Sequence, residues 1–127
     1  MPLVRISLRE GKPETYLQKI GDAVHRALVE TASVPAQDRF QLITEHSGSQ
    51  FIYDPEYLNI HRSDELIIIQ ITLNQGRTLE VKKALFAKIA ELLHQELELR
   101  KEDVLVNLVE VAKENWSFGN GVAQYAP

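Results

Sequence analysis

The chain has 127 residues, of which 44% are hydrophobic and 25% charged, and its formal net charge is −4. These values predict one globular domain, residues 1–127, with no nucleic-acid partner and no anionic membrane partner. The absence of cysteine excludes disulfides, thiol nucleophiles and thiolate metal ligands. Because no long apolar run or signal-peptide pattern opens the chain, we expect a soluble, cytoplasmic protein.

The first predicted strand, residues 2–8, raises a chemical question at its first position. Every second residue from Val4 to Leu8 is apolar, as in a strand with one buried face. Pro2 suits the start of such a strand, because no ladder N–H is needed there. Removal of Met1 would instead give Pro2 a free secondary amine, which its rigid ring would position for acid–base chemistry. Residue type alone favours the structural interpretation.

A helix and a second strand follow the first strand. Gly11 and Pro13 predict a turn and a helix start, and apolar residues then recur at helical spacing to about Ser33. Pro35 is predicted to end this helix, and residues 39–45 to form the second strand.

The second half of the chain has the same predicted order of elements. Residues 65–73 contain a run of large apolar residues that predicts a strand buried on both faces. Thr78 is a suitable N-cap for an amphipathic helix that extends to Leu97. Residues 104–111 are predicted to form the last long strand.

A shift of 65 residues superimposes the two halves, roughly residues 2–45 on residues 67–110, and brings similar residues together. This repeat predicts an α+β fold of duplicated β-α-β units. Right-handed crossovers would place both helices on one face of a four-stranded mixed sheet. The matched residues include Ile6 with Ile71, Gly11 with Gly76, Asp38 with Asp103 and Glu45 with Glu110.

The face of the predicted sheet that no helix covers indicates whether the protein forms an oligomer. Ile67, Ile69, Val106 and Leu108 exceed the apolar residues that one helical layer needs, which favours burial of this face between subunits. A ferredoxin-like monomer, which is also built from two β-α-β units, is the alternative.

The repeat also gives each candidate reactive residue a counterpart for comparison. Lys12 falls on Arg77, so both helix-entry loops carry a cation, and an arginine offers a two-pronged donor to a carboxylate. Asp38 and Asp103 both precede a strand, where aspartate commonly binds backbone N–H groups. For Arg77 and Asp38, a structural role is therefore as well supported as a chemical one. The four histidines have no metal-ligand spacing, so no metal site is predicted.

Four stretches together resemble the tautomerase superfamily, and most closely its malonate semialdehyde decarboxylase-like branch. They are Met1–Leu3 (MPL), Pro35–Gln41 (PAQDRFQ), Gln75–Thr78 (QGRT) and Trp116–Gly119 (WSFG). The resemblance implies a homotrimer in which each subunit covers another's open sheet face, with a small cavity around the amino-terminal proline. It implies no metal and no organic cofactor.

By this resemblance, Pro2 is the catalytic amine, Asp38 orients or activates a water, and Arg77 binds the carboxylate of the substrate. The other implied substrate-binding residues are Gln75 and the aromatic residues Trp116, Phe118 and Tyr125, for which simple packing under the C-terminal segment is the structural alternative. The best-known form of the decarboxylase pattern has two arginines in the loop where this chain has one.

The implied activity is decarboxylation of a small 3-oxo acid of the malonate semialdehyde type. One alternative is keto–enol tautomerisation of 2-oxo acids such as phenylpyruvate, with a neutral Pro2 as the proton shuttle. Another is a non-catalytic, cytokine-like trimer, which an intact amine without turnover would favour.

Overall fold

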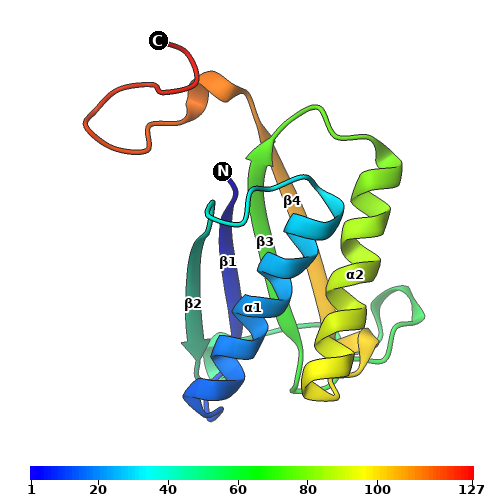
Figure 1. Ribbon diagram of the computed structural model, residues 1–127. Helices are drawn as coiled ribbons and strands as arrows, with labels where there is room; N and C mark the ends of the chain where they lie inside the picture. Colours follow the sequence, from blue (N-terminus) through cyan, green and yellow to red (C-terminus); the bar gives the residue numbers. More distant parts are fainter.

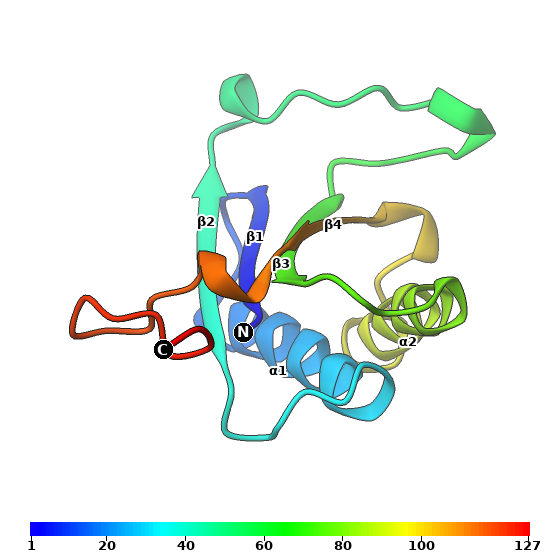
Figure 2. The same cartoon turned by 90° about the horizontal axis from the view of Figure 1, so that it is seen from above.

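Four strands and two helices form the structure, a computed structural model that describes residues 1–127. The elements are β1 (Leu3–Arg9), α1 (Glu14–Thr31), β2 (Phe40–His46), β3 (Ile67–Asn74), α2 (Leu79–Leu97) and β4 (Val104–Val111). The strand order is β2-β1-β3-β4, with a central antiparallel pair and two outer parallel pairs. Both helices cover the same face of the sheet (Figures 1 and 2), which confirms the predicted fold class.

The helix ends follow local chemistry. Thr78 caps α2 as predicted, since its Oγ1 accepts a hydrogen bond from the N–H of Val81 at 3.2 Å. Helix α1 ends at Thr31, before the predicted stop at Pro35, because Ser33 adopts a left-handed conformation with a φ of 58°. Neither helix combines the length and the apolar character that a membrane span requires.

The core lies between the two helices and one face of the sheet. Alternate residues of β1 and β3, from Val4 to Leu8 and from Ile67 to Leu73, point toward the helices and are almost fully buried. Val106 and Leu108 also pack against this core. The prediction that Ile67, Ile69, Val106 and Leu108 exceed the need of the helical layer was therefore wrong, because that layer contacts all four.

The opposite face of the sheet is uncovered and carries other apolar residues. Strand pairing places Phe40 and Leu42 of β2 on this face together with Leu105 and Val109 of β4. These four side chains are between 36% and 52% exposed. Polar neighbours such as Arg5 separate them. An apolar surface of this kind on a sheet is typical of a subunit interface.

The correspondence between the two halves extends to their turns. Gly11 and Gly76, which follow β1 and β3, have φ values of 114° and 122°, a region that favours glycine. Ser33 and Glu98, which follow the two helices, have φ values of 58° and 56°. Each of these pairs is 65 residues apart, so the same turns join the elements of each half.

The correspondence continues beyond the strands. A short 3₁₀ helix follows β2 at Gly48–Gln50, and another follows β4 at Lys113–Asn115, again 65 residues apart. The same shift pairs two aromatic residues of the first connection with two of the C-terminal segment, namely Phe51 with Trp116 and Tyr53 with Phe118. The two halves therefore offer matched environments at opposite ends of the sheet.

Candidate active site

A hollow surrounds Pro2 at the end of the sheet where both termini lie (Figure 1). Pro2 is buried at the start of β1, and the hollow beside it measures about 200 Å³. Sequence reasoning named three of its lining residues and missed Phe40, which pairs with Leu3 across β1 and β2. The place of Phe40 at the start of the strand predicted over residues 39–45, two positions after Asp38, was the available indication. The lining residues are Pro2, Leu3, Phe40, Trp116, Ser117 and Phe118.

Three aromatic residues of the C-terminal segment form one side of this hollow and its surroundings, and we call Trp116, Phe118 and Tyr125 the aromatic wall. The rings of Trp116 and Phe118 are stacked, with centroids 5.3 Å apart and an interplanar angle of 5°. Tyr125 meets Phe118 edge-on at 5.1 Å. The wall residues predicted from sequence therefore lie together, and Trp116 and Phe118 line the same hollow as Pro2.

Asp38 binds the amino end of the chain. Its two carboxylate oxygens lie 2.9 and 3.1 Å from the ammonium nitrogen of Met1. The residue is held by a turn in which its own N–H donates to the carbonyl of Pro35 at 3.0 Å. No other group hydrogen-bonds to this carboxylate, which is 19% exposed. Asp38 thus carries a negative charge beside the terminal amine.

Asp103, the repeat counterpart of Asp38, has a different environment. It is fully buried, and its two oxygens accept hydrogen bonds from the N–H and the hydroxyl of Ser63, both at 2.7 Å. Arg100 lies 3.5 Å from one of these oxygens. The carboxylate of Asp103 therefore fastens the connection before β3 to the start of β4, whereas that of Asp38 serves no such purpose.

Arg77 extends from the loop after β3 and is partly buried. Its Nε and Nη2 donate to the carbonyl of Ala32 at 3.2 and 2.9 Å, and its Nη1 donates to the carbonyl of Asn74 at 3.2 Å. These bonds cap the C-terminus of α1. Because a guanidinium has five N–H donors, each terminal nitrogen keeps one for a ligand. A guanidinium can present two such N–H groups to one carboxylate.

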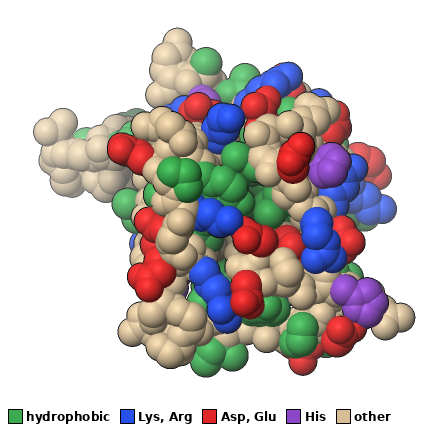
Figure 3. Space-filling view, turned by 90° about the horizontal axis from the view of Figure 1, so that it is seen from below, with side chains coloured by type: hydrophobic (Ala, Val, Ile, Leu, Met, Phe, Trp, Pro, Cys, Tyr) green, Lys and Arg blue, Asp and Glu red, His purple; other side chains and the backbone are tan.

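Lys12, the repeat counterpart of Arg77, is bound by an acidic side chain. Lys12 forms an ion pair of 2.6 Å with Glu65, and the hydrogen bond and charge of Glu65 raise the pKa of Lys12 above its ordinary value. Figure 3 views this end of the molecule, away from the two termini, where acidic and basic side chains lie beside one another. Of these two cations, only Arg77 has no acidic side chain bound to it.

Glu110 contributes a fixed negative charge near the Arg77 loop. A hydrogen bond from Lys82 at 2.7 Å lowers the pKa of Glu110, with smaller contributions from the N–H of Gly76 and the charge of Arg77. Gln75 does not join the hollow: its side chain is exposed and makes no hydrogen bond, while its N–H donates to the carbonyl of Val111. Its predicted role in substrate binding rests on the resemblance alone.

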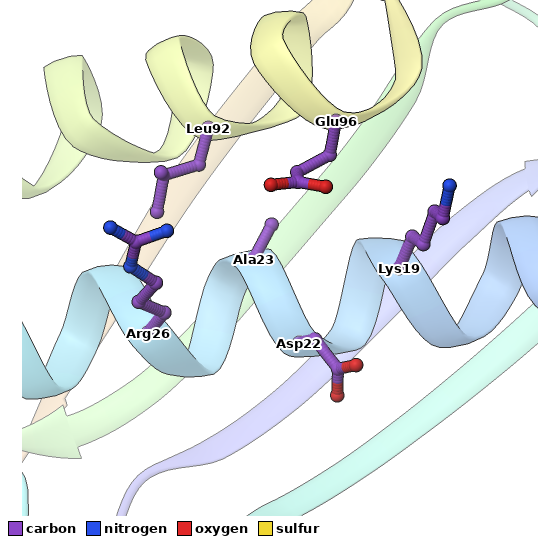
Figure 4. Close-up of a pocket in the computed structure, with 6 residues that line it drawn as sticks. All are labelled: Lys19, Asp22, Ala23, Arg26, Leu92 and Glu96. Carbon is purple, nitrogen blue, oxygen red and sulfur yellow. The ribbon is translucent and has the colours of Figure 1, made fainter.

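A second hollow of about 250 Å³ lies between α1 and α2, where Ala23 leaves space opposite Leu92 (Figure 4). Lys19 and Arg26 border it together with Asp22 and Glu96, so its charges balance. None of the predicted site residues lies there. This hollow therefore offers no chemistry comparable with that around Pro2.

Comparison with known proteins identifies the class that this fold and site define. A family profile described as "Tautomerase enzyme" matches residues 38–119, and a second profile of the same description matches residues 2–59. The chain belongs to the tautomerase enzymes.

Individual relatives cover nearly the whole chain. Probable tautomerase YusQ of Bacillus subtilis strain 168 is 50% identical over 124 residues, with 98% of each chain covered. FG41 malonate semialdehyde decarboxylase inhibited by 3-bromopropiolate is 41% identical, with a TM-score of 0.90 over 97% of this chain and 93% of that one. Another malonate semialdehyde decarboxylase, with decarboxylase and hydratase activities, is 28% identical, with a TM-score of 0.90 over 97% and 95%. The resemblance read from the sequence is therefore confirmed.

Proposed function

We propose that this tautomerase-family enzyme decarboxylates a small 3-oxo acid of the malonate semialdehyde type through the amine of Pro2, without a cofactor. If Met1 is removed, Pro2 becomes the first residue, and its nitrogen becomes a free secondary amine at the edge of the hollow. The similarity to two malonate semialdehyde decarboxylases supports this choice of substrate class.

The environment of Asp38 is the observation that carries the proposal. Its carboxylate binds only the terminal ammonium. The matching carboxylate of Asp103 instead accepts two hydrogen bonds from Ser63. A carboxylate beside an ammonium group accepts its N–H donors and balances its charge. A protonated Pro2 is an acid, which is the form that decarboxylation uses.

In the proposed sequence of events, Arg77 and Asp38, which do not line the hollow themselves, act on a substrate bound beside Pro2. The free N–H pair of Arg77 holds the carboxylate of the substrate, and the aldehyde oxygen faces the Pro2 ammonium. The bond between the carboxylate carbon and the methylene carbon breaks, its electron pair forms an enolate, and carbon dioxide leaves. Pro2 donates its proton to the enolate oxygen; a proton from water then adds to the methylene carbon, and the O–H proton returns to the Pro2 nitrogen, which yields the aldehyde and restores the ammonium. In this scheme Asp38 would accept a proton from a water that adds to the aldehyde.

Keto–enol tautomerisation of 2-oxo acids such as phenylpyruvate is the second candidate. The observation in its favour is the aromatic wall, whose stacked rings would accept a planar side chain. The name of the relative from Bacillus subtilis, Probable tautomerase, agrees with this candidate. Here the Pro2 amine would have to be neutral in order to remove a proton from carbon.

We also propose that the enzyme is a homotrimer in which the open sheet face is buried between subunits. The exposed apolar residues of β2 and β4 support this assembly.

An intact mass measurement followed by two assays tests the proposed function. We expect the purified chain to lack Met1, and 3-bromopropiolate, which inhibits the FG41 decarboxylase, to modify Pro2 and abolish turnover. Malonate semialdehyde should be consumed with a higher kcat/KM than phenylpyruvate. Full retention of Met1 in an active protein would contradict the role of the Pro2 amine. A higher kcat/KM for phenylpyruvate would favour the tautomerase instead.

A further inference from the structure

Asn74 is one of two buried polar residues of the protein, and its side chain binds the aromatic wall. Only 7% of its surface is exposed, at the end of β3. Its Oδ1 accepts a hydrogen bond of 2.7 Å from Nε1–H of Trp116. Its backbone carbonyl accepts the bond from Nη1 of Arg77. One residue therefore connects the loop that carries Arg77 with the segment that carries the aromatic wall.

The hydrogen bond to Asn74 fixes the orientation of the indole ring of Trp116. Trp116 follows the 3₁₀ helix Lys113–Asn115 in a segment without strand pairing, so no ladder fixes its side chain. A buried acceptor that binds the single N–H of an indole fixes the plane of that ring. Since Phe118 stacks on the same ring, the orientation of Trp116 sets the shape of the hollow beside Pro2.

The repeat provides an internal comparison for this bond. The residues that match Asn74, Trp116 and Phe118 are Arg9, Phe51 and Tyr53. Phe51 has no N–H to donate, and its ring is tilted by 57° against that of Tyr53 at 6.4 Å. Burial alone holds Phe51, which is 5% exposed. Its neighbour Tyr53 donates a hydrogen bond to Asp64 at 2.7 Å, but Phe51 itself makes no side-chain hydrogen bond. Because packing alone places the ring that matches Trp116, packing does not by itself explain the indole bond at the Pro2 end.

We propose that Asn74 is a positioning residue that holds the indole of Trp116 as a fixed wall of the Pro2 hollow and so selects small oxo-acids. This inference rests on the proposed function for its substrate class. A wall contact is made with the bound substrate and with the transition state alike, so its loss raises KM and leaves kcat nearly unchanged.

Trp116 is the only tryptophan of the chain, which allows the bond to be observed without any assay of activity. We expect Asn74→Leu to shift the single indole N–H resonance in ¹⁵N NMR spectra and to increase quenching of the fluorescence by acrylamide. Asn74→Asp keeps an oxygen acceptor and should preserve both properties. Gln95→Leu, which removes an exposed amide on α2, is the matched control and should change neither. An unchanged indole resonance in Asn74→Leu would overturn the inference.

Kinetics test the consequence of this bond for the substrate. Asn74→Leu should raise KM for malonate semialdehyde about 10-fold, because binding must then also immobilise the released indole, with Asn74→Asp close to wild type. Trp116→Phe removes the donor instead of the acceptor and also covers the case in which Asn74→Leu fails to fold. It should raise KM similarly, and the double variant should be no worse than either single one. A shifted resonance with an unchanged KM, or additive losses in the double variant, would contradict the inference.

Binding of 3-hydroxypropionate, a small non-reactive carboxylate, separates this inference from the proposed function. Wild type and Asn74→Asp should bind it about 10-fold more tightly than Asn74→Leu. That order in a protein that turns over no oxo-acid would contradict the proposed function and support the positioning role. Equal binding by all three proteins would overturn the positioning role, whatever the activity.

Discussion

Asp38 and Asp103 occupy matching positions, yet one carboxylate binds the chain terminus and the other a buried serine. We expect Asp103→Asn to lower the free energy of unfolding by about 2 kcal/mol, because it weakens charge-assisted hydrogen bonds in a buried site. Asp38→Asn should lower it much less, since its carboxylate binds only the terminal ammonium. Urea denaturation measures both values.

The same two variants should differ in the opposite sense in catalysis. Asp38→Asn should remove most decarboxylase turnover, because the amine loses its anionic neighbour, and should affect phenylpyruvate tautomerisation less. Asp103→Asn should leave both rates near wild type at a temperature where it is folded. Parallel losses of stability and activity in the two variants would make Asp38 a structural residue and favour the tautomerase alternative.

Arg77 and Lys12 form a second matched pair. Arg77→Ala should reduce kcat/KM by the equivalent of about 2–5 kcal/mol, since it removes the charge partner of the substrate carboxylate. Arg77→Lys should recover only part of this loss, because an ammonium lacks the two-pronged geometry. Lys12→Ala should leave kcat/KM unchanged, as Lys12 is paired with Glu65. Steady-state kinetics on all three variants test this, and equal losses at the two positions would mean that both loops act structurally.

Sequence alone could name these residues but could not separate their roles. The patterns PAQDRFQ and QGRT pointed to Asp38 and Arg77, and both had a structural alternative of similar weight. The contacts that distinguish Asp38 from Asp103 come from Ser63, which lies 40 residues before Asp103 in the chain. Asn74 was missed because no local pattern pairs it with Trp116, 42 residues away.

At the scale of single elements, the two strand-to-helix turns share a backbone conformation but not a function. Gly11 and Gly76 both have positive φ values, and a Cβ atom at either position would meet no neighbour within 4 Å. Gly11→Ala and Gly76→Ala should therefore each lower the free energy of unfolding by about 1–3 kcal/mol through backbone strain alone. Thermal or urea unfolding should give similar losses.

Only one of these turns presents a residue to the proposed substrate. Gly76 directly precedes Arg77, so Gly76→Ala should also reduce kcat/KM, whereas Gly11→Ala should not. Unequal stability losses would show that the turns differ in strain. Equal kinetic losses would show that activity follows overall stability.

The elements themselves were largely predictable from the sequence. The alternation of apolar and polar residues gave the bounds of the strands to within two residues, because each strand has one strongly apolar face. The end of α1 was misplaced because the left-handed conformation of Ser33 has no glycine or proline to indicate it. Val106 and Leu108 were wrongly expected on the open face of the sheet. They pack against the core, because the helical layer covers more of the sheet than expected.

For the whole molecule, the main prediction concerns the open face of the sheet. The protein should sediment as a trimer at micromolar concentration. Leu42→Glu, at the exposed centre of β2, should shift it toward monomer because a charge would be buried in the interface. Phe86→Glu, on the exposed side of α2, should leave the trimer intact. Analytical ultracentrifugation distinguishes these outcomes, and a fully active wild-type monomer would contradict the proposed assembly.

The two ends of the chain lie at the same end of the sheet as Pro2 (Figure 1), which has a practical consequence for handling this protein. An affinity tag joined ahead of Pro2 would turn its nitrogen into an amide, and under the proposed mechanism a fully folded sample would then lack activity. A tag on the last residue would emerge two positions after Tyr125, beside the aromatic wall. The connection between β2 and β3, at the far end of the molecule, is the safer place for a purification handle or a fluorescent label.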